Sequence, residues 1–339
     1  TFIVIFMTSP SQSAKFVDLV QVTRGNLVEN IHQGIAIAIN SNNQIIKKWG
    51  DTTTEIFPRS ALKPIQTFGI FTSGTYEALQ LSDERIAFTT SSHHAEPLHI
   101  EMAKQWLKDL KLDESNFTLG PSWPLGDKRR EDIVRNDGVK TKIYHNCSGK
   151  HLGQLSICVH KNFNISEYDN PSHPVQQLFI KNLEQLSEIK IKNIAIDGCG
   201  LPAPALPLER FAFALTKFAD PQQLSGLEQA AAKKIVQCCV DHPVYFGGSQ
   251  SINSILTKSS NKKILVKNGA DGVFAAIVPD KKMVVVVKIK DGNMKAAEVA
   301  IAGLLLDLKL LDHEIVQQLA HQPITNSVGV KSGSIKWIG

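Results

Sequence analysis

Strand patterns occupy both ends of this 339-residue chain, and helix patterns occupy its middle. Because segments from both ends can pair in one sheet, the order predicts an α/β (α+β) fold, with a mixed, mainly antiparallel sheet and an inserted helical region. A helix at 295–310 closes the pattern. The predicted strands lie at 16–23, 31–40, 45–49, 194–196, 264–269, 273–278 and 283–289, and the strand at 194–196 reads as buried.

Composition places the chain among ordinary globular proteins, with 42% hydrophobic and 20% charged residues. We expect a flexible tail over residues 1–15 and a single domain over 16–339. The apolar residues 1–7 are too few for a signal peptide or a membrane span, and no other segment is long enough to cross a bilayer. The net charge of +5 is dispersed, which disfavours nucleic-acid binding. Five cysteines, an odd number, favour a reducing compartment, so we expect a cytoplasmic protein.

A serine and a lysine three residues apart form the first candidate site. Ser60 and Lys63 share a helix face, so the amine of Lys63 could reach and activate the Ser60 hydroxyl. The amine must be neutral, which requires a partly dry or basic pocket because an ordinary lysine has a pKa of about 10.4. Pro64 is compatible with the first turn of that helix. The alternative is a capped helix start with a solvated lysine.

Two loops add polar side chains between predicted helices. Residues 89–97 contain Ser92, His93, His94 and Glu96, and they form either a binding loop or a capped helix start at Pro97. Residues 116–141 are polar and lack a period, so we expect a surface excursion that could act as a lid.

Two cysteines far apart in the sequence each lie in a glycine-containing polar loop. As thiolates, Cys147 and Cys199 would suit zinc, with a third ligand from Lys150, His151 or His94. Chemistry alone favours a histidine, because a lysine ligand must lose its proton. The alternative is a pair of structural thiols.

Lys267 strengthens the serine hypothesis. Penicillin-recognising hydrolases combine a serine-x-x-lysine motif, a second serine on a polar loop and a lysine-x-glycine triplet on a strand. Here Ser60 with Lys63, Ser92, and Lys267 with Gly269 follow in that order. Together they favour a catalytic Ser60.

Five motifs match another serine-lysine family more closely, and they resemble those of the Rhizobium etli-type (class 3, zinc-containing) L-asparaginases. The resemblance extends from about residue 16 to near the end of the chain. The motifs are Arg-Ser-Ala-Leu-Lys-Pro at 59–64, Ser-His-His-Ala-Glu-Pro at 92–97, Asn-Cys-Ser-Gly-Lys-His at 146–151, Asp-Gly-Cys-Gly at 197–200, and Lys-Asn-Gly-Ala-Asp-Gly at 267–272.

The resemblance implies a homodimeric amidohydrolase that converts L-asparagine to aspartate and ammonia, with a fold related to serine β-lactamases and glutaminases. It implies that Ser60 is the nucleophile, beside Lys63, and that Ser92 and Lys267 form a second serine-lysine pair. The remaining roles that it implies are zinc ligation by Cys147, Lys150 and Cys199, and substrate binding by Arg59, His151 and Asp197. His94 departs from the smaller residue expected in relatives.

Three other functions remain open on the sequence. They are a penicillin-recognising serine hydrolase, a glutaminase, and a non-catalytic zinc-binding relative. One methylene separates asparagine from glutamine and is worth only about 1–3 kcal/mol of discrimination.

Overall fold

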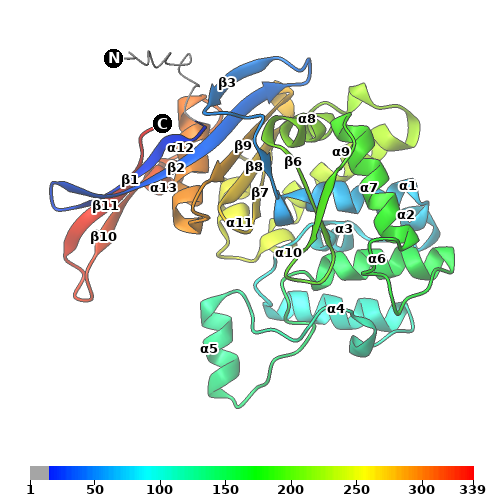
Figure 1. The fold of residues 1–339 in the computed structure, drawn as a ribbon. Coiled ribbons are helices and arrows are strands. Elements are labelled where there is room, and N and C mark those ends of the chain that lie inside the picture. Colours follow the sequence, from blue (N-terminus) through cyan, green and yellow to red (C-terminus); the bar gives the residue numbers. More distant parts are fainter. Residues whose placement is uncertain (1–14) are drawn as a thin grey trace, which may run out of the picture.

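A large antiparallel sheet forms the centre of the computed structural model, which describes residues 15–339 (Figure 1). It has eight strands in the order β10-β11-β1-β2-β9-β8-β7, with β3 paired to β2. The strands are β1 (Val17–Arg24), β2 (Leu27–Asn40), β3 (Ile45–Trp49), β7 (Leu265–Gly269), β8 (Val273–Val278), β9 (Met283–Ile289), β10 (His321–Thr325) and β11 (Lys331–Trp337). The prediction of a mixed α and β fold, with a mainly antiparallel sheet from both chain ends, is confirmed.

The central strands of this sheet are buried on both faces, and each face belongs to a separate core. On β2, Ile35, Ile37 and Ile39 join the core shared with the helical middle of the chain. Ala36 and Ala38 join the core on the opposite face. This alternation follows from the two-residue period of a strand, and it explains why the central strands are almost continuously apolar.

The helical middle covers the first face, and the C-terminal helices cover the second (Figure 1). Helix α1 lies against α6, α7 and α9, while α12 lies against β8, β9 and β11. The helices are α1 (Lys63–Thr72), α2 (Thr75–Ala78), α3 (Asp83–Thr89), α4 (Pro97–Asp109), α5 (Asp127–Arg135), α6 (Ser148–Lys161), α7 (Pro174–Ser187), α8 (Leu208–Ala219), α9 (Gly226–Asp241), α10 (Pro243–Gly247), α11 (Ile252–Ser259), α12 (Met294–Asp307) and α13 (Glu314–Ala320).

A small sheet of β4 (Glu55–Ile56), β6 (Pro202–Pro207) and β5 (Asn193–Ile196) lies within the helical region. The strand predicted at 194–196 is present, but the prediction that it is buried is wrong. Ile194 is 43% exposed and Ile196 is 63% exposed. The reason is that β5 is an edge strand that pairs only with β6.

The prediction that a helix is the last element of the chain is also wrong. After α12 and α13, the chain ends in the hairpin of β10 and β11, and β11 pairs with β1. Pro323 lies within β10, and proline in a run of residues argues against a strand unless the strand is at an edge, as β10 is. The hairpin therefore extends the sheet on the side of the chain's first strand.

The division into a tail over 1–15 and a single domain over 16–339 stays a prediction, because residues 1–14 lie outside the described residues. The predicted excursion at 116–141 contains the helix α5. Among residues 15–339, none of the helices is long and apolar enough to span a membrane.

Candidate functional site

Ser60 lies in a tight helical turn immediately before α1. The 3₁₀ turn η1 (Arg59–Leu62) precedes Lys63, and Pro64 stands in the first turn of α1 as expected. Lys63 has helical backbone angles even though it precedes a proline. The turn is pressed against β7, since a Cβ atom at Gly269 would lie 2.2 Å from the Pro58 carbonyl oxygen. Only glycine permits this close approach.

Two buried lysines meet at one serine, and we call Lys63, Ser92 and Lys267 the lysine–serine cluster. The Ser92 hydroxyl lies 3.3 Å from Lys63 Nζ and 2.9 Å from Lys267 Nζ. Lys63 Nζ also donates to the carbonyl of Ser91, whereas Lys267 Nζ also donates to Asn268 O and Oδ1 at 2.9 and 2.8 Å. The fold therefore joins β7, α1 and the loop after α3 at a single hydroxyl.

The expected bond from Lys63 to Ser60 is not formed. In the part of the chain that the structure describes, the half-buried Ser60 hydroxyl has no hydrogen-bond partner, and the Lys63 amine is bonded to Ser91 and Ser92 instead. The reason is local, because Ser60 belongs to the 3₁₀ turn and Lys63 begins the α-helix. Ser92 is thus the residue that both amines contact.

Burial changes the protonation of these lysines. Both side chains are almost completely inaccessible to water. Burial, followed by the nearby charge of Lys63, holds the pKa of Lys267 well below its usual range. A neutral Lys267 has one lone pair, and among its three partners only the Ser92 hydroxyl can donate to it.

Arg59 connects Ser60 to two turns of the chain. Its guanidinium lies 2.7 Å from Asp197 Oδ1, in the turn after β5, and also pairs with Asp271 in the turn after β7. Burial would lower the pKa of Arg59, but the two carboxylates raise it overall. Arg59 has a φ of +54°, in the left-handed region that non-glycine residues rarely adopt. Such strain persists where surrounding contacts enforce it, and the η1 turn that contains Arg59 packs against β7.

A second buried group, which we call the cysteine cluster, consists of Cys147, Lys150 and Cys199. All three side chains are at most 5% exposed, and Lys150 Nζ lies 3.0 Å from Cys199 Sγ. A hydrogen bond from Cys199 holds the pKa of Cys147 well below its usual range despite burial, and Lys63 and Lys150 lower it further. Burial would lower the pKa of Lys150, but the two sulfurs raise it overall.

The donor atoms of the cysteine cluster are of types that zinc accepts. Two sulfur atoms and one nitrogen are donors that suit zinc, and the lowered pKa of Cys147 favours the thiolate form that a metal binds. Among residues 15–339, no three side chains of His, Cys, Asp and Glu are placed to hold a metal ion together. The histidine ligand that chemistry favoured is therefore not found among these residues, and Lys150 offers a nitrogen that contacts Cys199. Lys150 would have to release its proton on metal binding.

His151 follows Lys150 on α6 but points to a different partner. Its Nδ1 atom lies 2.5 Å from the Tyr168 hydroxyl, and its buried Nε2 atom has no partner within the described residues. An unpaired buried polar atom costs free energy unless a ligand or water satisfies it. No sequence motif pointed to Tyr168, which lies in a loop between α6 and α7.

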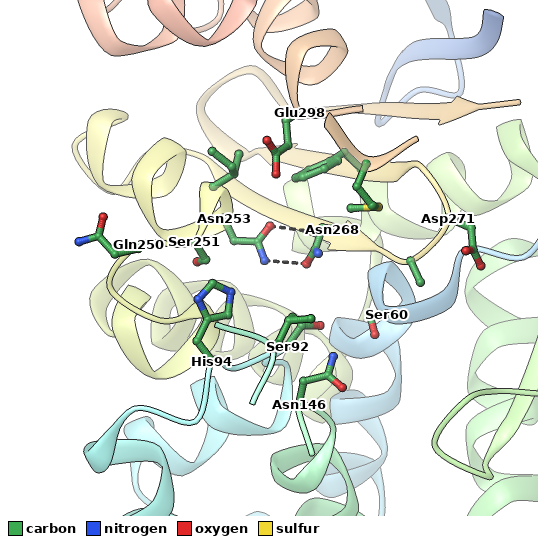
Figure 2. A pocket seen from close by; sticks show the side chains of 15 residues that line it. Ser60, Ser92, His94, Asn146, Gln250, Ser251, Asn253, Asn268, Asp271 and Glu298 are labelled. Carbon is green, nitrogen blue, oxygen red and sulfur yellow. Dashed lines mark hydrogen bonds between the residues drawn. The ribbon is translucent and has the colours of Figure 1, made fainter. Parts of the chain in front are cut away.

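A cavity of about 450 Å³ opens beside both serines. Ser60, Ser92 and His94 lie on one side of it, and Asn268 and Asp271 lie on the other (Figure 2). His94 therefore borders the cavity rather than the cysteine cluster, while His93 is buried and bonded to Ser148. The remaining lining residues are Leu125, Asn146, Gln250, Ser251, Ile252, Asn253, Ala270, Phe274, Met294 and Glu298.

The fold brings together part of each predicted group, whereas among the described residues Ser60 and His151 form no hydrogen bond with the other members of their groups. Lys63, Ser92 and Lys267 meet at one hydroxyl, Lys150 meets Cys199, and Arg59 meets Asp197. Three further features of the site were not predicted from the sequence. These are Asp271 as a partner of Arg59, Tyr168 as a partner of His151, and the cavity residues on α11 and α12.

Comparison with known families gives the class of this protein. The sequence model of the L-asparaginase II family matches residues 20–337. The chain therefore belongs to the L-asparaginase II family, which indicates an amidohydrolase.

Solved structures align with most of this chain at low sequence identity. A β-lactamase from Mycobacterium bovis is 13% identical, with 82% of this chain and 95% of that chain covered and a TM-score of 0.45. The protein Mglu in its native form is 10% identical, with 87% of this chain and 66% of that chain covered and a TM-score of 0.48. A search of curated protein sequences found no match.

Proposed function

We propose that this protein is an L-asparagine amidohydrolase that releases aspartate and ammonia through an acyl-enzyme on Ser60. The observation that carries the proposal is the Ser92 hydroxyl, which contacts both buried lysine amines and borders the same cavity as Ser60. Family membership supports the reaction class.

The lysine–serine cluster would move the protons. Neutral Lys267 accepts a proton through Ser92 as Ser60 attacks the side-chain amide carbonyl. The same path returns the proton to the nitrogen as the carbon–nitrogen bond breaks, so ammonia leaves and the aspartyl ester of Ser60 remains. Water then hydrolyses the ester and restores the Ser60 hydroxyl. Lys63 contacts the same Ser92 hydroxyl and would stabilise the negative charge that develops there.

Arg59, His151 and Asp197 would bind the amino-acid part of the substrate. The Arg59 guanidinium offers a cation for a carboxylate, and Asp197 offers an anion for an ammonium group. His151 has a ring nitrogen without a partner among the described residues. These groups supply opposite charges beside Ser60, as an α-amino acid requires.

Cys147, Lys150 and Cys199 would hold zinc. When bound there, zinc would supply a positive centre that positions substrate and supports the pocket. The chain's own part is to bury the three donors and to favour the thiolate of Cys147.

We propose a homodimer and a cytoplasmic location, both supported by the resemblance to class 3 asparaginases. Light scattering of the purified protein would measure the mass, and a monomer at micromolar concentration would contradict the dimer.

Ammonia release from asparagine and glutamine, measured at controlled zinc concentration, tests the function. We expect asparagine to be preferred by about 10-fold to 200-fold in kcat/KM, the range that one methylene gives. Faster release from glutamine would reassign the enzyme as a glutaminase. Metal binding without hydrolysis of either amide would favour a non-catalytic relative, and acylation of Ser60 by a labelled penicillin would favour a penicillin-recognising hydrolase.

A further inference from the structure

The cavity beside Ser60 is larger than asparagine requires. Its volume of about 450 Å³ falls in the range of about 300–1,000 Å³ that holds drug-sized ligands. It continues past Asn268 near the end of β7 and reaches Phe274 and Met294, which pack in or against the core on the α12 side of the sheet. We call the part of the cavity beyond Asn268 its second half. Figure 2 shows Glu298 on that side of the hydrogen-bonded pair of Asn253 and Asn268. The site thus has room for a group attached to the amide.

The lining of the cavity is acidic. No lysine or arginine lines the cavity, whereas Asp271 and Glu298 do. Asp271 is paired with Arg59. Glu298 stands between the buried Ala297 and Val299 on α12, and its carboxylate faces the cavity (Figure 2). Its side chain is 23% exposed, and its partner Lys295 is 3.5 Å away and half exposed.

The direction of the leaving group follows from the proposed function, on which this step rests. The nitrogen that leaves must receive a proton from the lysine–serine cluster, and Ser92 is the member of that cluster that borders the cavity. The amino-acid part lies toward Arg59 and Asp197 in the same scheme. A substituent on the leaving nitrogen would therefore enter the cavity and extend toward Glu298.

We propose that the site also hydrolyses asparagine derivatives whose side-chain amide nitrogen carries a chain ending in a cation, with Glu298 as the residue that selects the charge. Ser60 forms the same aspartyl ester, and the carbon–nitrogen bond breaks. The leaving amine takes the proton from the cluster, and water releases aspartate. The products are aspartate and an alkyl amine that bears a second cationic group.

Three substrates of similar length test this inference. They are asparagine with an aminobutyl, a pentyl or a carboxypropyl chain on the amide nitrogen. We expect the wild-type kcat/KM to be about tenfold higher for the aminobutyl than for the pentyl compound, and lowest for the carboxypropyl compound. Aspartate release, followed by an enzyme-coupled assay, measures all three.

Variants of Glu298 locate the selectivity. Glu298→Gln is expected to reduce the aminobutyl-to-pentyl ratio to about two or less, and Glu298→Asp to retain most of it. The ratio compares two substrates on one variant, so it does not depend on the amount of active enzyme. Glu101→Gln, at an exposed position on α4, is the matched control and should keep the wild-type ratio.

The outcomes separate this inference from the proposed function. Equal wild-type rates for the aminobutyl and pentyl compounds, or an unchanged ratio in Glu298→Gln, would overturn the selective role of Glu298. Hydrolysis of asparagine with no hydrolysis of any substituted amide would overturn the inference alone. Failure to hydrolyse asparagine would instead remove the proposed function.

Discussion

Lys150 and Lys267 are both buried, yet their surroundings change their protonation in opposite directions. In the cysteine cluster, two sulfurs raise the pKa of Lys150 above its usual value. In the lysine–serine cluster, burial and the second cation, Lys63, lower the pKa of Lys267. Burial disfavours the charge of both amines, so the neighbouring groups decide the result. One cluster therefore favours a fixed charge, whereas the other favours a neutral amine that can accept a proton.

The largest effect is expected at Ser60. Ser60→Ala removes the proposed nucleophile and should lower ammonia release from asparagine by at least about a thousandfold. The Ser60 hydroxyl has no hydrogen bond in the described chain, so the free energy of unfolding should change by less than about 0.5 kcal/mol. Near-normal turnover in a folded variant would refute the proposal. Thermal unfolding of both proteins provides the control.

Lys267→Arg would place a permanent charge at Lys267 and so remove the difference in protonation between Lys267 and Lys150. Arginine stays charged, so it cannot accept a proton, and we expect kcat/KM for asparagine to fall by about 10²–10⁴. Lys217→Arg on α8 is the control, because Lys217 lies outside both clusters and should be replaceable. Wild-type activity in Lys267→Arg would show that a neutral amine at this position is unnecessary.

The pH profile examines the same amine without a substitution. Protonated Lys267 cannot act as a base, so kcat/KM should be lost as the pH falls through its pKa. Since burial lowers that pKa, activity should persist far below the value of about 10.4 of an ordinary lysine. A profile that keeps rising up to pH values near 10 would instead indicate an unshifted lysine.

Cysteine substitutions test the other cluster. Cys147→Ala and Cys199→Ala should each lower bound zinc from about one ion per chain to about a tenth of that or less, because two donors hold the ion poorly. Cys158→Ala is a matched control on α6, since burial raises the pKa of this thiol to about 12 and it lies outside the cluster. Elemental analysis after dialysis measures the metal. Full retention in both cluster variants would contradict a zinc site there.

The smallest effect is expected at the exposed end of the Arg59 bridge. The Asp271 side chain is 64% exposed and the Asp197 side chain is 15% exposed. Exposed ion pairs contribute only about 0–1 kcal/mol, so Asp271→Asn should raise KM for asparagine by about fivefold or less. Asp197→Asn should raise it more. A larger rise in KM for Asp271→Asn than for Asp197→Asn would show that exposure does not decide which carboxylate matters more for asparagine binding.

The sequence predicted the central strands because local patterns specify them. The strands at 31–40 and 45–49 and the apolar runs of β8 and β9 can be recognised from the local sequence alone. The C-terminal hairpin was missed because β11 depends on β1, more than 300 positions earlier in the chain. The exposure of β5 was missed because the composition of a strand does not reveal whether the strand lies at the edge of its sheet.

The site was predictable where motifs carry the chemistry and unpredictable where only the fold does. Serine, lysine and cysteine motifs pointed to Ser60, Ser92, Lys267 and the cysteine pair. The bonding of Lys63 to Ser92 depends on how the loop after α3 packs on α1, which spacing cannot give. Glu298 could have been noticed as an acid in the apolar run of α12, but only the structure shows that it faces a cavity.

The close approach at Gly269 separates two properties that could otherwise change together in evolution. A Cβ at this position would lie 2.2 Å from the Pro58 carbonyl, so any other residue would push the Ser60 turn away from β7. Residues of α12 line the far wall of the cavity, and α12 is a separate element from both β7 and the Ser60 turn. A lineage of such proteins could therefore exchange substrates through α12 while the position of its nucleophile is inherited unchanged.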